Sequence, residues 1–174
     1  MSEPFSRVIR VDAIPIEGRT VTLEATPEER RALAKLYQLP SIDALTTSLS
    51  LAHASGGAVR VTGAVHGELT QICVVSLDPF PATIDEAIDV RFAPREIAED
   101  RARPETLVFS MSDEDEPDPI VDGKIDLGAL AAEFFALGID PYPRKPGVIF
   151  DTPVDRSDPV TPFAVLRDFG KGQK

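Results

Sequence analysis

Residues 58–92 read AVRVTGAVHGELTQICVVSLDPFPATIDEAIDVRF, and two runs of alternating apolar and polar residues meet there around a central turn. In the first run, one face carries the mainly apolar positions Val59, Val61, Val65, Leu69, Cys73 and Val75. The opposite face of that run is mostly polar and carries Arg60, Thr62, His66, Glu68 and Thr70. In the second run, the apolar set is Ile84, Ile88, Val90 and Phe92, against Asp85, Asp89 and Arg91. A period of two with one apolar face is typical of half-buried antiparallel strands, so this stretch predicts a long β-hairpin.

The link between the two runs, residues 77–81, has the sequence Leu-Asp-Pro-Phe-Pro. Asp-Pro and Phe-Pro are typical of turns, and a proline cannot donate a hydrogen bond to a neighbour in a central strand. We therefore place Pro79 and Pro81 in the turn rather than in a strand.

The chain before the hairpin predicts two short strands and a helix. Residues 5–11 and 20–25 are the strand candidates, because they alternate or are rich in β-branched residues. Thr26 is a helix cap, proline occupies the first helical position, and Glu29 completes a capping box. The helix ends before Pro40, and its predicted apolar stripe consists of Leu33, Leu36 and Tyr37.

Residues 42–53 alternate again, and one side of this run carries Leu45, Thr47, Leu49, Leu51 and His53. A short Ser-Gly-Gly link at residues 55–57 leads into the hairpin. The middle of the chain is therefore predicted to be a three-stranded antiparallel meander preceded by a helix. The predicted fold class is α+β, with helices packed on an antiparallel meander or a partly closed barrel. The pattern leaves open whether the sheet closes.

A second helix is predicted from Leu127 to about Leu137. Asp126 is its N-cap, and Ile125 and Leu130 occupy the positions of a hydrophobic staple. We expect the helix to lie on the sheet with an apolar face made of Leu127, Leu130, Ala131, Phe134 and Leu137.

Gly138 suits a left-handed end of this helix, and Pro141 and Pro143 prevent the helix from continuing. The following residues, 140–147, read DPYPRKPG and form a rigid proline-rich segment with one aromatic side chain and two adjacent cations.

Between the hairpin and the second helix the pattern is weaker. Residues 96–105 predict a short helix and residues 107–111 one more strand. Residues 112–119 read SDEDEPDP, with five carboxylates and two prolines, and predict a solvated acidic loop. A metal site is the alternative reading, but the loop lacks the glycine and the ligand spacing of a calcium loop.

The length of 174 residues predicts one domain over residues 1–150, followed by an extended tail at residues 151–174. Within that tail, residues 162–169 read PFAVLRDF and form a candidate docking motif.

The formal net charge is -11. Nucleic-acid binding depends on lysine and arginine side chains that neutralise phosphates, so this chain is a poor general binder of RNA or DNA. A basic protein is the partner that its charge favours.

No run approaches the roughly 20 apolar residues that span a membrane, and the N-terminus lacks the apolar core of a signal peptide. With a single cysteine as well, we expect an intracellular, reducing location.

The residues offer little catalytic chemistry. A zinc site needs three or four ligands, whereas the chain has His53, His66 and Cys73, and the alternation puts Cys73 and His66 on opposite faces. The same separation excludes a Cys–His nucleophilic pair, because the base must reach the thiol. We therefore expect no enzyme activity, no metal and no cofactor, with Cys73 as a small buried hydrophobe.

The order of these pieces resembles the YceD family, the large ribosomal RNA subunit accumulation proteins of bacteria and plastids. Residues 67–80, GELTQICVVSLDPF, resemble a family segment that often has Cys-x-x-Cys, or Cys-x-Arg-Cys, at the hairpin turn. Residues 123–127, GKIDL, with the following helix and the DPYP of residues 140–143, are similar to the family's acidic-Leu helix and proline-bearing segment. Residues 162–166, PFAVL, resemble a common terminal Pro-Phe-x-x-Leu.

The chain departs from the family pattern at the turn. Cys73 occupies the position of the first family cysteine, but Ser76 stands at the second, and the downstream cysteines of some members are absent after Pro143. The resemblance thus implies the family's fold and role without a metal site. The turn would then be held by packing of Leu77 and Phe80 alone.

The resemblance implies a cytoplasmic ribosome biogenesis factor that supports accumulation of large-subunit (23S) ribosomal RNA. Together with the negative net charge, the resemblance suggests that the protein binds a basic ribosomal protein or assembly factor. RNA would then be reached indirectly, and we expect no DNA or membrane partner. The candidate partner-binding residues are Tyr142, Arg144, Lys145, Asp113, Glu114, Asp115 and Glu116. The alternative for the first three is a structural strap over the second helix, and for the acidic residues a solubility feature.

A second function class remains open, namely a small-ligand-binding or catalytic barrel with His53 or Glu68 as acid–base groups. It predicts a deep pocket lined by one of these side chains. A sheet face filled by leucine and valine side chains would argue against it.

Overall fold

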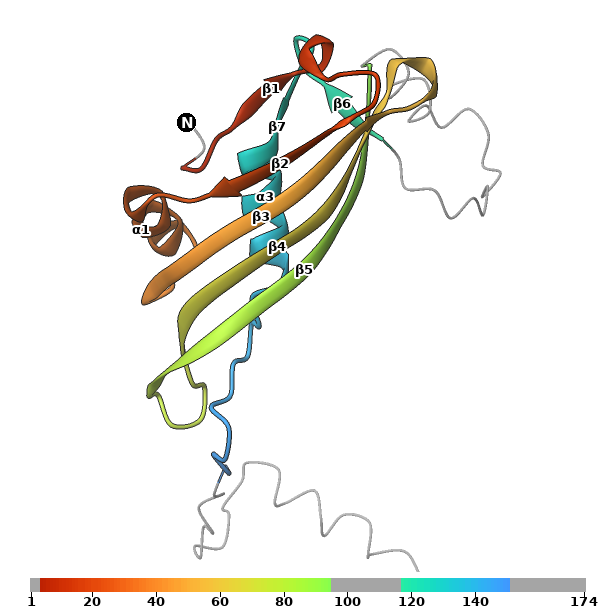
Figure 1. Cartoon of the computed structure of the whole chain (residues 1–174). Helices are drawn as coiled ribbons and strands as arrows, with labels where there is room; N and C mark the ends of the chain where they lie inside the picture. The colour runs from red at the N-terminus through yellow and green to blue at the C-terminus, as the bar shows by residue number, and fades with distance from the viewer. Residues whose placement is uncertain (1–3, 95–116, 151–174) are drawn as a thin grey trace, which may run out of the picture.

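The computed structural model of the chain describes residues 4–94 and 117–150. These residues form two α-helices, α1 (Pro27–Leu36) and α3 (Leu127–Leu137), and two short 3-10 turns at Val11–Ala13 and Ser55–Gly57. The strands are β1 (Val8–Arg10), β2 (Arg19–Glu24), β3 (Ser41–His53), β4 (Val59–Ile72), β5 (Pro79–Pro94), β6 (Asp118–Ile120) and β7 (Lys124–Asp126) (Figure 1).

Five strands form one sheet in the order β2-β3-β4-β5-β6, and β1 pairs with β7 in a separate two-stranded sheet. All pairings are antiparallel except that of β5 with β6. The predicted α+β class and the three-stranded meander are therefore confirmed. The larger sheet has β2 and β6 at its two borders, so it is open rather than closed into a barrel.

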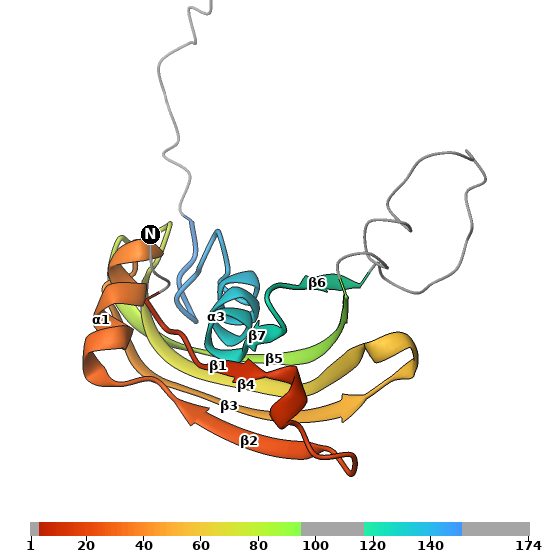
Figure 2. The same ribbon diagram turned by 90° about the horizontal axis from the view of Figure 1, so that it is seen from above.

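The five-stranded sheet is strongly curved, and Figure 2 shows α3, β1 and β7 lying inside the curve while α1 lies at one end. The concave face carries the core, including the fully buried side chains of Leu49, Leu51, Val61 and Val65. The convex face carries short polar and small side chains such as Ser48, Ser50, Ala64 and Ala87, all exposed. One covered and one solvated face is the usual arrangement of an antiparallel sheet.

The predicted hairpin is confirmed as β4 and β5, which pair continuously from Val59 opposite Phe92 to Ile72 opposite Pro79. The prediction that Pro79 and Pro81 lie in the turn is wrong, since both residues belong to β5. Among the described residues, β6 is the strand on the other side of β5, and it pairs only with residues 92–94. The prolines therefore lie where β5 is an edge strand, a place where a missing N–H costs no ladder bond.

Helix α1 begins as predicted. Thr26 accepts a hydrogen bond from the Glu29 backbone N–H, and the Glu29 carboxylate accepts one from the Thr26 backbone N–H. Its predicted apolar stripe is correct for Leu33, which is fully buried, but wrong for Leu36, which is 55% exposed. Ala34 is buried in its place.

Helix α3 has the predicted bounds and the predicted cap, because the Asp126 carboxylate accepts hydrogen bonds from the backbone N–H groups of Gly128 and Ala129. The predicted apolar face is rotated by about one residue. Phe135 rather than Phe134 is fully buried, and Leu137 is 72% exposed.

The predicted left-handed end of α3 is wrong, since Gly138 has a right-handed conformation with φ -77°. A glycine is needed there for space. A Cβ atom on Gly138 would lie 2.5 Å from Ile84 Cγ2 and 2.7 Å from Glu86 Cγ, so the helix end lies directly against β5.

The contact between α3 and β4 is equally close. Gly67 faces the core in the middle of β4, and a Cβ atom there would lie 2.3 Å from Cε2 of the Phe135 ring. The ring thus occupies the space that a side chain at position 67 would need. This fit selects Phe135 over Phe134 as the aromatic side chain that meets the sheet.

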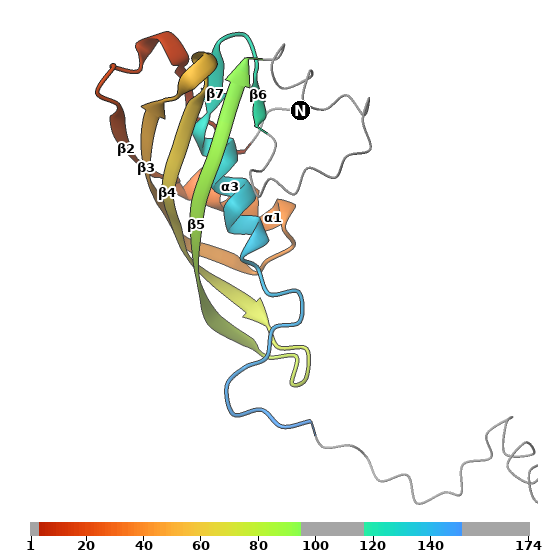
Figure 3. The ribbon, with the colours of Figure 1, turned by 90° about the vertical axis from the view of Figure 1, so that its right-hand side faces the viewer.

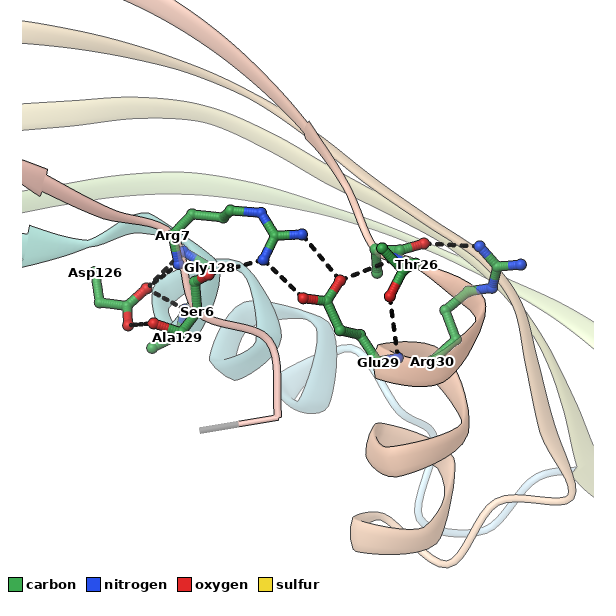
Figure 4. Close-up of polar contacts among 9 residues, drawn as sticks. Ser6, Arg7, Thr26, Glu29, Arg30, Asp126, Gly128 and Ala129 are labelled. Carbon is green, nitrogen blue, oxygen red and sulfur yellow. Dashed lines mark hydrogen bonds and ion pairs between the residues drawn. The ribbon is translucent and has the colours of Figure 1, made fainter. Parts of the chain in front are cut away.

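A polar network joins the N-terminal ends of the two helices (Figure 4). The Arg7 guanidinium donates to both oxygens of Glu29, at 2.7 and 2.9 Å, and the Arg7 backbone N–H donates to Asp126 Oδ1 at 2.7 Å. The hydrogen bonds from Arg7, together with those of Thr26, hold the pKa of Glu29 at about 2. Burial opposes ionisation of Asp126, but hydrogen bonds from the Ser6 hydroxyl and from three backbone N–H groups outweigh it and lower its pKa.

Several predicted elements lie outside the described residues: the helix at 96–105, the strand at 107–111, most of the acidic loop and the docking motif at 162–169. The loop prediction over residues 112–119 is wrong at its end, because Asp118 and Pro119 belong to β6 and pair with Phe92 and Ala93. None of the described helices is both long enough and apolar enough to cross a membrane.

The Phe135–Gly67 contact predicts that Gly67→Ala destabilises the protein by about 1–3 kcal/mol, the usual cost of overpacking a core. Urea denaturation measures this. Phe135→Leu makes room for the new methyl group, so the double variant should lose less stability than the sum of the two single variants. Simple additivity of the two losses would contradict the contact.

The Arg7–Glu29 pair predicts a specific acid sensitivity. Because the folded pKa of Glu29 is about 2, below its usual 4.5, its contribution is fully present above pH 4.5 and is lost as the pH falls toward 2. We expect Glu29→Gln to cost about 1–3 kcal/mol at pH 7, and less as the pH falls through that range, in urea denaturation at several pH values. The control is Glu28→Gln, because Glu28 forms an exposed pair with Arg31 at 3.7 Å. Exposed pairs contribute little, so the effect should be close to zero at every pH.

Candidate functional site

The segment after α3, residues 140–150, runs along the hairpin to its tip (Figure 3). We call this segment the strap. The buried Gln71 side chain donates a hydrogen bond to the Asp140 carbonyl at 3.0 Å, and the Val74 backbone N–H donates to the Pro143 carbonyl at 2.9 Å. The strap is thus tied to β4 and to the turn that follows it.

Cys73 lies at the centre of this junction and is fully buried. Its sulfur accepts hydrogen bonds from two backbone N–H groups, that of Ser76 in the turn at 3.4 Å and that of Lys145 in the strap at 3.3 Å. Its own backbone closes the turn, since its N–H donates to the Asp78 carbonyl and its carbonyl accepts from the Leu77 N–H, both at 2.9 Å. One residue therefore connects the turn to the strap.

The electrostatics of the sulfur follow from these donors. The pKa of Cys73 is lowered to about 6, mainly by the hydrogen bond from the Ser76 backbone N–H. The Lys145 backbone N–H adds to this effect, and burial of the sulfur opposes it. Hydrogen bonds donated to a sulfur favour the thiolate.

The prediction that Leu77 and Phe80 alone hold the turn is wrong. Leu77 has a positive φ of 61° and is 73% exposed, so it points away from the turn. Backbone and sulfur hydrogen bonds hold the turn instead, together with an ion pair between Lys145 Nζ and Asp78 Oδ2 at 3.6 Å.

The candidate residues of the strap lie on this junction. The Tyr142 side chain is 74% exposed, while its backbone N–H donates to Asp140 Oδ1 at 2.8 Å. Arg144 is exposed. Lys145 contacts the turn twice: its backbone N–H donates a hydrogen bond to the Cys73 sulfur, and its ammonium group forms an ion pair with Asp78. The structural reading of this segment as a strap therefore has support, but the strap crosses the hairpin tip rather than α3.

Exposed apolar side chains are concentrated in the turn and in the strap, a feature that the sequence analysis missed. Six of the eleven exposed large hydrophobic side chains in the described part of the chain belong to residues 72–77 and 142–150. We call this set the tip surface, and it consists of Ile72, Val74, Leu77, Tyr142, Ile149 and Phe150. Ile72 and Val74 occupy the outward positions of the alternating run, a signal that the sequence did contain. A concentration of exposed apolar side chains on neighbouring segments is a candidate interaction surface.

The structure describes only some of the other candidate residues. Asp113, Glu114, Asp115 and Glu116 lie outside the described residues. His53 Nε2 lies 2.9 Å from the Ile14 carbonyl, and His66 Nδ1 lies 2.7 Å from Asp85 Oδ1 on the convex face.

Metal ligation does not fit the geometry of the part of the chain that the structure describes. In the described ranges, no group of three or more histidine, cysteine, aspartate or glutamate side chains is placed to hold an ion. At the turn, Cys73 supplies one sulfur, and the groups within hydrogen-bond distance of that sulfur are the backbone N–H donors of Ser76 and Lys145. Donors cannot coordinate a cation, and zinc needs at least three ligands.

A barrel with a catalytic interior does not fit either. The sheet is open, its concave face is filled by Leu49, Leu51, Val61 and Val65, and Glu68 is exposed on the other face.

The family model of the large ribosomal RNA subunit accumulation protein YceD matches residues 61–169 of the chain. This range is more than half of the 174 residues, and it contains most of the hairpin together with α3 and the strap. It confirms the resemblance predicted from the sequence. Comparison with curated proteins and with solved structures gave no match.

The Cys73 environment predicts a low thiol pKa. The absorbance of the thiolate near 240 nm should rise with a midpoint at a pH of about 6 and shift toward 9 in denaturant, with Cys73→Ala as the blank. Because the folded pKa is the lower one, the stability difference between the native protein and Cys73→Ala should grow as the pH rises from 6 to 9. A midpoint unchanged by unfolding would contradict the two N–H···S bonds.

Proposed function

The chain belongs to the YceD family, and from this premise we propose that it supports the accumulation of large-subunit (23S) ribosomal RNA as a non-enzymatic binding protein. Its direct partner in this proposal is a basic ribosomal protein or assembly factor, and RNA is reached through that partner.

The tip surface is the observation that carries the binding role. It gathers exposed apolar side chains on a turn and a strap that are fastened to each other by hydrogen bonds. A surface that is already ordered loses little conformational entropy on binding. Tyr142 suits a contact of this kind, because a tyrosine offers a large rigid apolar area and a polar end.

The charge supports the choice of a basic partner. A net charge of -11 repels RNA phosphates over the molecule as a whole and attracts basic proteins. In this proposal the acidic residues 113–116 steer the partner during approach, which raises the association rate more than the affinity. Arg144 and Lys145 are too few to neutralise the roughly six to ten phosphates of a typical nucleic-acid interface.

We expect depletion of the protein to lower the amount of 23S ribosomal RNA relative to 16S. A tagged copy should sediment with large-subunit precursors in a gradient, and raised salt should release it. Unchanged 23S levels, with the tagged protein only at the top of the gradient, would exclude the proposed role.

The tip surface is tested by the double variant Leu77→Ala/Tyr142→Ala. Both side chains are more than 70% exposed, so thermal stability should change little, while recovery of basic ribosomal proteins in pull-downs and rescue of the depleted strain should fall several-fold. The matched control is Leu36→Ala on α1, an exposed leucine away from the tip, which should rescue fully. Full rescue by the double variant would remove the tip surface from the proposal.

A further inference from the structure

The outer edge of β5 is largely without a pairing strand in the described part of the chain. Within the described ranges β5 pairs with β4 along its whole length, but on its other side it pairs only through residues 92–94 with β6. Residues 82–91 of β5 therefore have no strand on that side in the part of the chain that the structure describes. In Figure 3, β5 forms the near border of the sheet.

An unpaired strand of this kind presents backbone donors and acceptors at alternate residues. Ten residues correspond to roughly 33 Å of strand at about 3.3 Å per residue, which is longer than a typical strand of five or six residues. The two ends of this edge are blocked, because Pro79 and Pro81 lie at one end and β6 at the other. The open part is therefore bounded and has a defined length.

The charge of this edge selects its partner. Residues 82–91 carry the three carboxylates Asp85, Glu86 and Asp89 and one cation, Arg91, so the edge is acidic on balance. A second copy of the chain is disfavoured, because antiparallel pairing of two β5 edges about Ala87 would set Asp85 of one copy opposite Asp89 of the other. The opposite border of the sheet, β2, has six residues with one cation and one carboxylate, Arg19 and Glu24, so it has no such preference.

The two faces of the edge differ in polarity. Asp85 and Asp89 are exposed on the convex face, where they contact His66 and Arg60 of β4. Ile84 and Ile88 are buried on the concave face beside α3, and the half-buried Glu86 lies between them against the end of that helix. Val90 and Phe92, farther along on the concave face, are only partly buried and pack against the core. A strand added beside β5 would meet carboxylates with one set of its side chains and the flank of the core with the other set.

We propose that the open edge of β5 binds an extended segment of a partner protein in which basic and apolar residues alternate, so that the segment becomes an additional strand of the sheet. This is strand addition, a common mode of peptide recognition in which backbone hydrogen bonds give affinity and alternate side chains give specificity. The inference rests on the proposed function for the basic character of the partner. It adds the conformation, the residue pattern and the place at which that partner binds.

The test uses the full chain, labelled with nitrogen-15, and an eight-residue peptide that alternates lysine and valine. Amide signals of residues 82–90 should shift on titration, and β2 amides should not. A peptide that alternates glutamate and valine, and one with proline at each valine position, should leave the signals unchanged. Amides of residues 82–90 that are all protected from hydrogen exchange before any peptide is added would show that the edge is already covered and would overturn the proposal.

The contribution of the β5 carboxylates is tested by the double variant Asp85→Asn/Glu86→Gln, which should weaken binding of the lysine–valine peptide roughly threefold to tenfold. The matched control, Glu17→Gln/Glu24→Gln, removes the same charge from exposed sites elsewhere and should change binding less than twofold. Equal weakening by both variants would mean that the net charge of the protein, and not the β5 edge, attracts the peptide. If the peptide shifts no amide signal of residues 82–90, the carboxylates of this edge serve only to keep copies of the chain apart. Either result would overturn the edge site while leaving the effect of depletion on 23S ribosomal RNA, and with it the proposed function, untouched.

Discussion

The Phe135 ring lies against the bare backbone of Gly67, and this contact fixes how the C-terminal half of the fold lies on the hairpin. The ring sets the rotation of α3 about its axis, and Gly138 lets the end of the helix approach β5 equally closely. The chain therefore leaves the helix beside β4, where Asp140 meets Gln71 and Pro143 meets Val74. A shift of α3 would move the strap, and with it Tyr142 and the tip surface.

Local rules were sufficient for much of this fold. The hairpin follows from alternation, and both helix starts follow from Thr26 and Asp126, because caps and periodicity depend on neighbours in sequence. Errors occurred where distant residues decide. Helical periodicity favoured Phe134 over Phe135, and the space at Gly67 on another element reverses that choice. Pro79 and Pro81 are acceptable in β5 because of what lies beside that strand, which alternation does not reveal.

The candidate site was found only in part for the same reason. Tyr142, Arg144 and Lys145 stood out as an aromatic and two cations between prolines. The hydrogen bond from Lys145 to Cys73, however, joins residues 72 positions apart in the sequence. At this junction two backbone N–H groups, those of Ser76 and Lys145, donate to the one sulfur. Hydrogen bonds from the turn and the strap therefore hold the strap on the hairpin tip. That is the physical basis for treating the tip surface as ordered before any partner arrives.

The seam between α3 and β4 is tested most directly by nuclear Overhauser effects between the Phe135 ring protons and the Hα protons of Gly67. The account predicts strong effects between them, and a ring-current displacement of at least one Gly67 Hα signal. Effects from Phe134 in place of Phe135, or Gly67 signals at random-coil positions, would contradict it.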